Sequence, residues 1–565
     1  MPHHRPAILG IALLCATFLT STLAPEQARA ATADASGLYA DYLSARFAAA
    51  QDDSATAAEY YLRALEQNPE QADLLRHAFL ASALSGRVEA AGLARLLPDD
   101  ALAELWLAGA AAKDGDWAGV KRRAEALGRD KLADNQLAKV LRPLLLAWAE
   151  QAQGRTAAAL ATLSPLAAQG QFHALFALHQ GLIADLAGQE TLAATAMAQA
   201  RDVDGPPGLR LAQMLASFDA RHGRQAAGLG ELGQAGAGAP EIALALPALS
   251  ERMANPAVRD AKDGIAEAFL AAAGSLRMDD HGQPAMLLLR ITLTLRPDFA
   301  AAQLLSAGIE EEREQPEAAG RTLDAVITTD DPLAPLARLH RAELAVQTGD
   351  TDAALAAFDA LARECPHSAL PLVRKAEVLR ATGRFAEAVG VYDEAMAWEP
   401  KPNWALFYER GVARDQAHDR TGGEADMRKA LELAPDQPLV LNYLGYSWAE
   451  RGEHLDDARR MIEAAVQAEP QDGAIIDSLG YVMLRQGDVA DAVRTLERAT
   501  ELVPDDATVN GHLGDAYAAA GRRLEAGYEW RRALLLHPEP DEAERLKAKL
   551  DLPPRQSASA VAPPR

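Results

Sequence analysis

Cysteine and positive charge are scarce in this sequence. Its 565 residues include two cysteines, Cys15 and Cys365, which excludes a framework of several disulfides and a cysteine-based metal site. Lys and Arg number 56 against 80 Asp and Glu, so the net charge is −24. This balance argues against a nucleic-acid partner and against binding of anionic lipid through a basic face. The acidity would keep a long chain soluble, and it would also favour basic segments of a partner.

Motifs that carry chemistry are missing too. The letters Gly228-x-Gly230-x-x-Gly233 match a dinucleotide fingerprint, but no strand pattern precedes them, so we interpret the match as accidental. There is no phosphate-binding loop, no paired-histidine zinc motif and no nucleophile elbow. His173 and His179 lie off one helical face and make poor joint metal ligands. The sequence therefore predicts no catalytic residue, no cofactor and no metal site, and so a protein that is not an enzyme.

Alanine and leucine dominate instead. Hydrophobic residues make up 49% of the chain and aromatic residues 5%, a composition that favours a packed helical core over disorder. A globular chain of this length would form several domains, whereas in a solenoid each repeat packs only on its neighbours.

Residues 1–30 have the layout of a secretory signal. A weakly positive start around Arg5 is followed by the apolar run Ala7–Leu19, a break at Pro25 and the small-x-small sequence Ala28-Arg29-Ala30. The apolar run is shorter than the roughly 20 residues that a spanning helix needs. Cleavage after Ala30 would release a mature chain in which no other apolar stretch is long and pure enough to cross a membrane. An uncleaved membrane anchor is the alternative.

A repeat of 34 residues is the strongest signal in the chain. The segments 473–506 and 507–540 align without a gap. Internal similarity at this period indicates a stack of helical hairpins. The matching positions are Leu479 with Leu513, Gly480 with Gly514, Gly487 with Gly521, Ala492 with Ala526, Ala499 with Ala533, and Pro504 with Pro538.

Each of these positions has a physical role in a pair of amphipathic helices. Gly480 is small where the first helix approaches the second, and Ala492 and Ala499 are small on the second helix for the same contact. Gly487 ends the first helix in a left-handed conformation, and Pro504 stops the second helix. The pattern resembles the tetratricopeptide repeat. The resemblance implies an all-α fold, a right-handed α-solenoid of helix-turn-helix repeats.

Four segments are expected along the chain. They are the signal peptide at 1–30, degenerate N-terminal repeats at 31–265, a regular array of about eight repeats at 266–540, and a capping helix with a disordered Pro/Ala-rich tail at 541–565. The Gly-rich stretch that begins near Leu229 is interpreted as a worn helix pair or a hinge between two arms.

Binding is expected on the concave face, which the first helices of such repeats line. Tyrosine there would offer rigid apolar contact, while Asn, Asp and His would add hydrogen bonds to a peptide backbone. The alternative is that the tyrosines only pack between repeats. The candidate residues of this groove are Tyr408, Asn442, Tyr446, Asp477, Tyr481, Arg485, His512 and Asp515.

The C-terminal stretch is more specific than the general repeat. Leu441–Tyr446, Ile476–Tyr481 and Asn510–Asp515 resemble a family of exported proteobacterial proteins with a signal, loose N-terminal repeats and a regular C-terminal block. Some members are outer-membrane lipoproteins that act as adaptors for a periplasmic processing protease and deliver cell-wall hydrolases to it. This sequence departs from them at Cys15, because a lipobox has a small residue directly before the cysteine and Leu14 is not small.

The resemblance implies a non-enzymatic scaffold or adaptor of the bacterial cell envelope. The protein would be exported to the periplasm and associated with the outer membrane only through its partners. Those partners would be peptide segments of other proteins, including a periplasmic protease and its substrates. Two alternatives stay open: a chaperone-like holder of envelope proteins, and the repeat component of a polysaccharide-export system.

Overall fold

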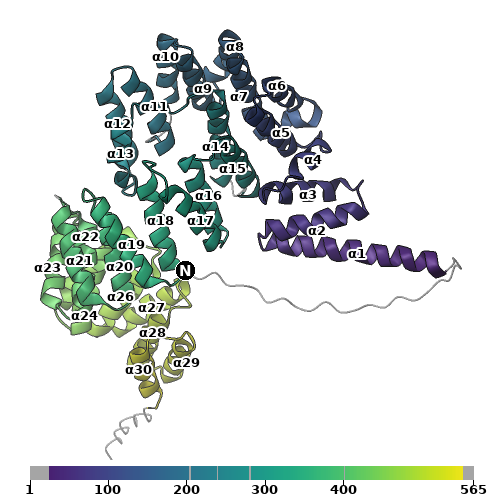
Figure 1. Cartoon of the computed structure of the whole chain (residues 1–565). Helices are drawn as coiled ribbons and strands as arrows, with labels where there is room; N and C mark the ends of the chain where they lie inside the picture. Colours follow the sequence, from purple (N-terminus) through teal and green to yellow (C-terminus); the bar gives the residue numbers. More distant parts are fainter. Residues whose placement is uncertain are drawn as a thin grey trace, which may run out of the picture. The chain divides into compact units, whose positions relative to one another are not determined.

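The computed structural model describes residues 25–202, 205, 207–237, 239–278, 282–399 and 401–551. These residues form α-helices and two short 3-10 helices, without a β-strand (Figure 1). The predicted all-α fold of helix-turn-helix repeats is confirmed. Residues 1–24 of the predicted signal and the predicted disordered tail from Pro553 onward lie outside the described residues.

The chain divides into two compact units, Met1–Leu344 and Ala345–Arg565. The sequence predicted the boundary between the degenerate and the regular repeats near residue 265, well before this division. The helices of the N-terminal unit are α1 (Pro25–Ala50), α2 (Ser54–Gln67), α3 (Ala72–Leu84), α4 (Ala90–Arg95), α5 (Ala101–Asp114), α6 (Trp117–Ala126), η1 (Asp130–Asp134), α7 (Gln136–Ala152), α8 (Thr156–Ala167), α9 (His173–Leu186), α10 (Glu190–Ala200), α11 (Leu209–Arg221), α12 (Gln225–Ala237), η2 (Ile242–Leu244), α13 (Leu246–Glu251), α14 (Ala261–Met278), α15 (Gly282–Leu295), α16 (Ala300–Glu312), α17 (Pro316–Ile327) and α18 (Ala334–Gln347), the last of which crosses the division.

Helical hairpins follow one another through the first part of this unit. Helix α1 already begins at Pro25, before the predicted cleavage point after Ala30. The dinucleotide-like glycines at 228–233 lie inside α12, a helix rather than a strand-to-helix turn, so their match is accidental as interpreted. Five turns in this part have the left-handed backbone that glycine allows, with φ between 72° and 75°, at Gly86, Gly115, Gly154, Gly188 and Gly223.

Helices α14 and α15 do not continue this row of neighbours. Helix α14 packs on α7, and α15 packs on α5 and α3. The contacts are close because glycines stand at the crossings: a Cβ added to Gly264 would lie 2.3 Å from the Trp148 ring, and one added to Gly109 would lie 2.2 Å from Ile291. This hairpin was expected to begin the regular array, but it packs back against the first helices instead.

Polar contacts also join the beginning of the N-terminal unit to its later helices. Arg313, after α16, forms an ion pair with Asp52 in the turn between α1 and α2. Lys262 at the start of α14 donates a hydrogen bond to the carbonyl of Lys113 at 3.1 Å. The N-terminal unit therefore closes on itself, which a row of repeats in contact only with their neighbours would not do.

The C-terminal unit is a regular row of hairpins. Gly487 ends the first helix of its repeat with a φ of +90°, as predicted. A Cβ at Gly480 would lie 2.5 Å from Leu496 and one at Gly514 2.5 Å from Trp530, so the helices of each pair touch where glycine stands. The helices of this unit are α19 (Thr351–Glu364), α20 (Leu370–Ala381), α21 (Phe385–Trp398), α22 (Trp404–Gln416), α23 (Arg420–Leu433), α24 (Pro438–Arg451), α25 (Leu455–Ala468), α26 (Gly473–Gln486), α27 (Val489–Leu502), α28 (Ala507–Ala519), α29 (Arg523–Leu535) and α30 (Pro540–Asp551).

The crossing of α14 over α7 gives a matched pair of substitutions on one helix. Gly264→Ala should lower the free energy of unfolding by about 1–3 kcal/mol, because its methyl group would overlap the fully buried Trp148. Gly274→Ala should instead raise it by up to about 1 kcal/mol, since no atom lies within 4 Å of the added Cβ and alanine favours the helix. Urea unfolding followed by circular dichroism measures both. Equal effects of the two changes would contradict the assigned crossing.

Candidate functional site

The first helices of the C-terminal repeats present their polar and aromatic residues in two columns. Asn442 and Tyr446 are four residues apart on α24, and Asp477 and Tyr481 are four residues apart on α26. Side chains at this spacing share one face of a helix. Because successive first helices pack side by side, α24 on α26 and α26 on α28, the columns run from repeat to repeat.

Aromatic rings from three repeats meet on this face. The ring centroids of Tyr446 and Tyr481 are 5.3 Å apart. The ring of Tyr481 stacks on that of His512 at 4.5 Å, and Tyr446 lies 6.3 Å from the same histidine. Both tyrosines are half-buried. We call Tyr446, Tyr481 and His512 the ring cluster; it offers an apolar surface with polar edges.

A buried ion pair fixes the histidine of the ring cluster. His512 Nδ1 lies 2.8 Å from Asp477 Oδ2, and both residues are largely buried. Burial by itself lowers the pKa of His512, but attraction and the hydrogen bond from Asp477, together with Asp515 and Glu542, outweigh it and raise this pKa above its ordinary value. The surroundings of His512 in the folded chain therefore favour its charged form more than water does.

Arg485 lies at the edge of the ring cluster. Its Nη1 donates to the hydroxyl of Tyr481 at 3.1 Å and to the carbonyl of Glu450 at 2.8 Å. The arginine side chain is exposed. It therefore connects Tyr481 of its own helix α26 to α24 of the preceding repeat, while part of its surface stays open.

The remaining predicted groove residues are used differently. Tyr408 forms a separate edge-to-face pair with Tyr443, whose centroid is 5.9 Å away. Asp515 accepts hydrogen bonds from Trp530 at 3.0 Å and from Lys549 of α30 at 2.7 Å. It therefore connects α28 to the last helices of the array. Asn442 is half-buried, and its Oδ1 has no hydrogen-bond partner among the described residues.

The alternative interpretation of the tyrosines is thus correct in part. Tyr446 and Tyr481 do pack between repeats, and they remain half-buried on the same face. Carboxylates surround them: Glu450, Asp477 and Glu542 all act on Tyr446, although burial is the larger reason that its pKa lies far above its ordinary value. The face therefore combines aromatic surface with negative charge.

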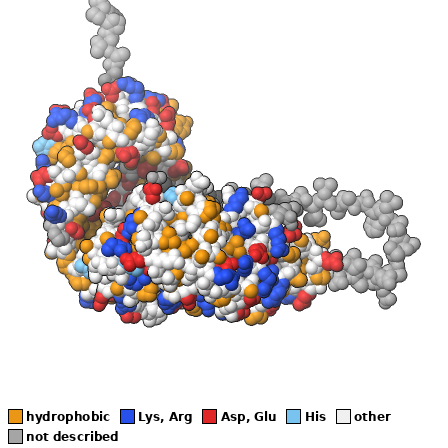
Figure 2. All heavy atoms as spheres, turned by 90° about the horizontal axis from the view of Figure 1, so that it is seen from above, with side chains coloured by type: hydrophobic (Ala, Val, Ile, Leu, Met, Phe, Trp, Pro, Cys, Tyr) orange, Lys and Arg blue, Asp and Glu red, His pale blue; other side chains and the backbone are white. Residues whose placement is uncertain are grey.

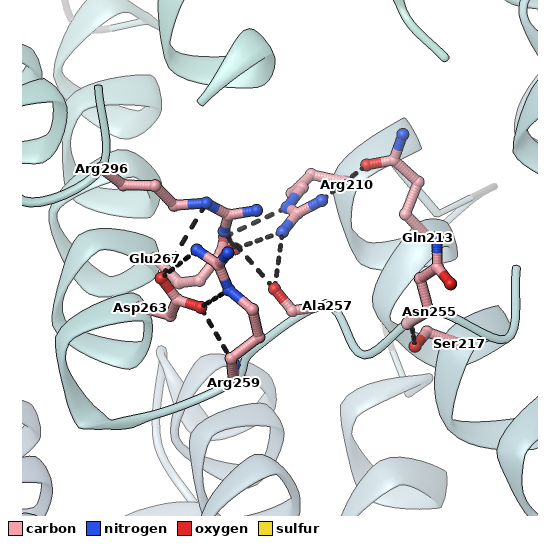
Figure 3. Close-up of polar contacts among 9 residues, drawn as sticks. All are labelled: Arg210, Gln213, Ser217, Asn255, Ala257, Arg259, Asp263, Glu267 and Arg296. Carbon is pink, nitrogen blue, oxygen red and sulfur yellow. Dashed lines mark hydrogen bonds and ion pairs between the residues drawn. The ribbon is translucent and has the colours of Figure 1, made fainter. Parts of the chain in front are cut away.

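A second polar cluster lies in the N-terminal unit, and sequence reasoning missed it. Figure 3 shows three arginines converging on Glu267 and Asp263 of α14. Arg210 donates from Nε to Glu267 at 3.1 Å, Arg296 donates to the same carboxylate at 3.3 Å, and Arg259 donates from Nε to Asp263 at 2.7 Å. These three arginines and two carboxylates are the arginine cluster.

The arginine cluster is built to hold helices together. Glu267 and Asp263 have side chains that are 1% and 5% exposed, so their charges must be paired. Burial would raise the pKa of Asp263, but hydrogen bonds from Arg259 and the charge of Arg296 keep it below its ordinary value. The only sequence signal was a pair of acidic residues four apart in the Ala-rich helix 261–278, which by itself also fits a solvated face.

Charge is mixed on the molecular surface. On the face drawn in Figure 2, Lys and Arg side chains lie among Asp and Glu side chains rather than in one patch of a single sign. Within the part of the chain that the structure describes, no helix has the length and apolar character needed to cross a bilayer. The same residues contain no group of three or more His, Cys, Asp and Glu side chains placed to hold a metal ion.

Comparison with known proteins identifies the repeats. Residues 345–410 match one tetratricopeptide repeat family model, and residues 310–369 and 478–543 match another. These stretches are therefore tetratricopeptide repeats, as the 34-residue pattern predicts. Repeats of this type bind other proteins or peptides and serve as interaction scaffolds.

Two curated relatives each match about a third of this chain. The chain is 32% identical over 180 residues to a TPR repeat-containing protein of Pseudomonas aeruginosa, which covers 32% of this chain and 30% of the relative. It is 26% identical over 208 residues to the mouse aspartyl/asparaginyl beta-hydroxylase, covering 34% of this chain and 28% of that enzyme. The chain thus spans less than a third of these relatives. An enzyme occurs among proteins with similar repeats, so the repeats alone do not decide between enzyme and scaffold.

Solved structures with detectable likeness are also repeat proteins. A tetratricopeptide repeat protein from Parabacteroides merdae is 17% identical, with a TM-score of 0.37, over 44% of this chain and 97% of its own. The yeast Tom70 structure is 13% identical, with a TM-score of 0.34, over 91% of this chain and 95% of its own.

The His512–Asp477 pair predicts a pH dependence of stability. The pKa of His512 is higher in the folded chain than in the unfolded chain. The pair therefore contributes fully to the free energy of unfolding below the unfolded pKa of about 6.5, and this contribution is lost as pH rises through the folded pKa. The urea midpoint of the wild-type chain should therefore fall across this window more than that of Asp477→Asn. Asp505→Asn, an exposed acid in the α27–α28 turn, is the control and should behave like wild type. Parallel curves for wild type and Asp477→Asn would show that the pair carries no pH-linked stability.

Proposed function

We propose that the first-helix face of α24, α26 and α28 binds a peptide segment of a partner protein. The observation that carries this proposal is the ring cluster, in which side chains from three successive repeats form one half-buried aromatic surface. An extended segment running along the repeats would meet one polar and one aromatic position on α24 and on α26, and His512 on α28. Rigid aromatic surfaces of this kind contribute strongly to protein interfaces.

The chemistry of the face favours a donor-rich, basic segment. Asn442 Oδ1 and Asp477 Oδ1 are buried acceptors without a hydrogen-bond partner among the described residues. Glu450 and Glu542 add negative charge beside the rings. Both acceptor atoms add negative potential beneath the face, and Lys or Arg side chains of the partner would complement the carboxylates. Binding should accordingly weaken as salt concentration rises.

In the cell, this binding would make the chain a non-enzymatic adaptor of the bacterial envelope. The layout of residues 1–30 supports export to the periplasm. The resemblance of the C-terminal block to exported proteobacterial repeat proteins supports an adaptor for a periplasmic processing protease. Two compact units in one chain offer two separate surfaces for two partners.

Removing the proposed contacts should abolish capture without unfolding the chain. The triple variant Asn442→Ala, Tyr446→Ala, Tyr481→Ala should weaken binding of an isolated partner at least about tenfold, as expected when interface anchors are truncated. Isothermal calorimetry measures the affinity, and circular dichroism checks the helix content. Tyr528→Ala, which removes a 67% exposed tyrosine of α29, is the control and should leave affinity unchanged. Undiminished binding by the triple variant would exclude this face.

The partner itself is found by crosslinking the tagged chain in intact cell envelopes. Mass spectrometry should recover a processing protease together with a cell-wall hydrolase if the adaptor proposal is right. Recovery of many unrelated envelope proteins would instead indicate a chaperone-like holder. The triple variant is crosslinked in parallel. Proteins that wild type recovers and the triple variant does not are groove-dependent partners, and proteins that both recover are background.

A further inference from the structure

An apolar cavity that is partly open to solvent lies in the N-terminal unit, whereas the ring cluster belongs to the C-terminal unit. The volume of the cavity is about 440 Å³, and α9, α11, α14 and α16 supply most of its walls. That volume falls in the range of about 300–1,000 Å³ that small-molecule sites occupy. The larger apolar side chains of the lining are Leu175, Leu178, Leu211, Met214, Leu270 and Leu305.

Three polar residues line the cavity, and none offers a free charge. Arg210 and Glu267 are paired with each other in the arginine cluster (Figure 3). His179 is 1% exposed, and burial lowers its pKa to about 3, so it is neutral at physiological pH. A ligand that enters this cavity without an uncompensated charge must itself be neutral.

His179 is one of the residues that line the cavity. Its Nδ1 lies 3.0 Å from Trp148 Nε1. An indole N–H can only donate, so Nδ1 must accept, and the single proton of the neutral ring is then on Nε2. A buried donor of this kind is best satisfied by an acceptor oxygen.

We infer that this cavity binds a neutral acyl chain, with the alkyl part against the leucines and an ester carbonyl oxygen accepting from His179 Nε2–H. A peptide is a poorer occupant, because each of its backbone N–H and C=O groups would need a partner that the apolar walls lack. A free fatty acid is a poorer occupant as well, because its carboxylate would find Arg210 already paired. The inference concerns the other unit of the chain and stands independently of the peptide face.

Glycine at position 274 makes the cavity testable without disrupting the fold. Gly274 lines the cavity from α14, and a Cβ added there meets no atom within 4 Å. Gly274→Leu should therefore fill the space while favouring the helix. Gly230→Leu is the matched control, because this exposed glycine of α12 also has open space around its Cβ but does not line the cavity.

The assay uses the full chain and the uncharged fluorophore 1-N-phenylnaphthylamine, displaced by methyl decanoate. Wild type and Gly230→Leu should bind the fluorophore in one-to-one stoichiometry and release it to the ester, and Gly274→Leu should lose at least about tenfold in affinity for both. Equal binding by Gly274→Leu and wild type, or no displacement from wild type, would overturn the inference.

The role of His179 has its own readout. Wild type should prefer methyl decanoate over decane by about five- to tenfold, the worth of one hydrogen bond. His179→Phe, which keeps an aromatic ring but no donor, should bind the two equally. A wild type that prefers laurate over the ester would show an anion site instead and would contradict the assignment of a neutral ligand.

Discussion

The structure depends on how closely two helices can approach each other. In three successive repeats of the C-terminal unit, the first and second helices touch at a position where a Cβ would overlap the opposite helix, at Gly445, Gly480 and Gly514. Close approach lets small interiors be packed from Ala and Leu with few aromatics, because contact area is made by backbone proximity rather than by large side chains. The larger residues are then available for the faces that successive repeats present.

The same constraint is used once more in the N-terminal unit, with a different result. There, Gly264 and Gly109 let the α14–α15 hairpin cross the earlier helices instead of extending the row. Such a crossing places Asp263 and Glu267 in the interior, where burial of their charges is tolerated only because Arg210, Arg259 and Arg296 reach them. The crossing also leaves the apolar cavity between α14 and the helices around it.

The two units therefore suit different chemistry. The C-terminal unit keeps a continuous face with rings, unpaired acceptors and carboxylates, which fits an extended chain that can be contacted in every repeat. The N-terminal unit has a partly open apolar cavity whose polar lining residues carry no free charge, which fits a neutral small molecule. Neither property follows from the repeat fold alone, because the same hairpin packing is compatible with many surfaces.

The sequence by itself determined the helical hairpins, their glycine turns and the columns of the C-terminal face. These features come from contacts within a repeat or between adjacent repeats, so they recur every 34 residues and leave a periodic trace. Only the tertiary structure decided which column residues meet: Tyr446, Tyr481 and His512 form one cluster, whereas Asp515 serves α30. It also decided that α14 packs on Trp148 and that His179 accepts from Trp148 and lines a cavity. The contacts of α14 and of His179 with Trp148 each join segments that are far apart in the sequence, and each occurs once. A contact that occurs once produces no periodic pattern in the sequence.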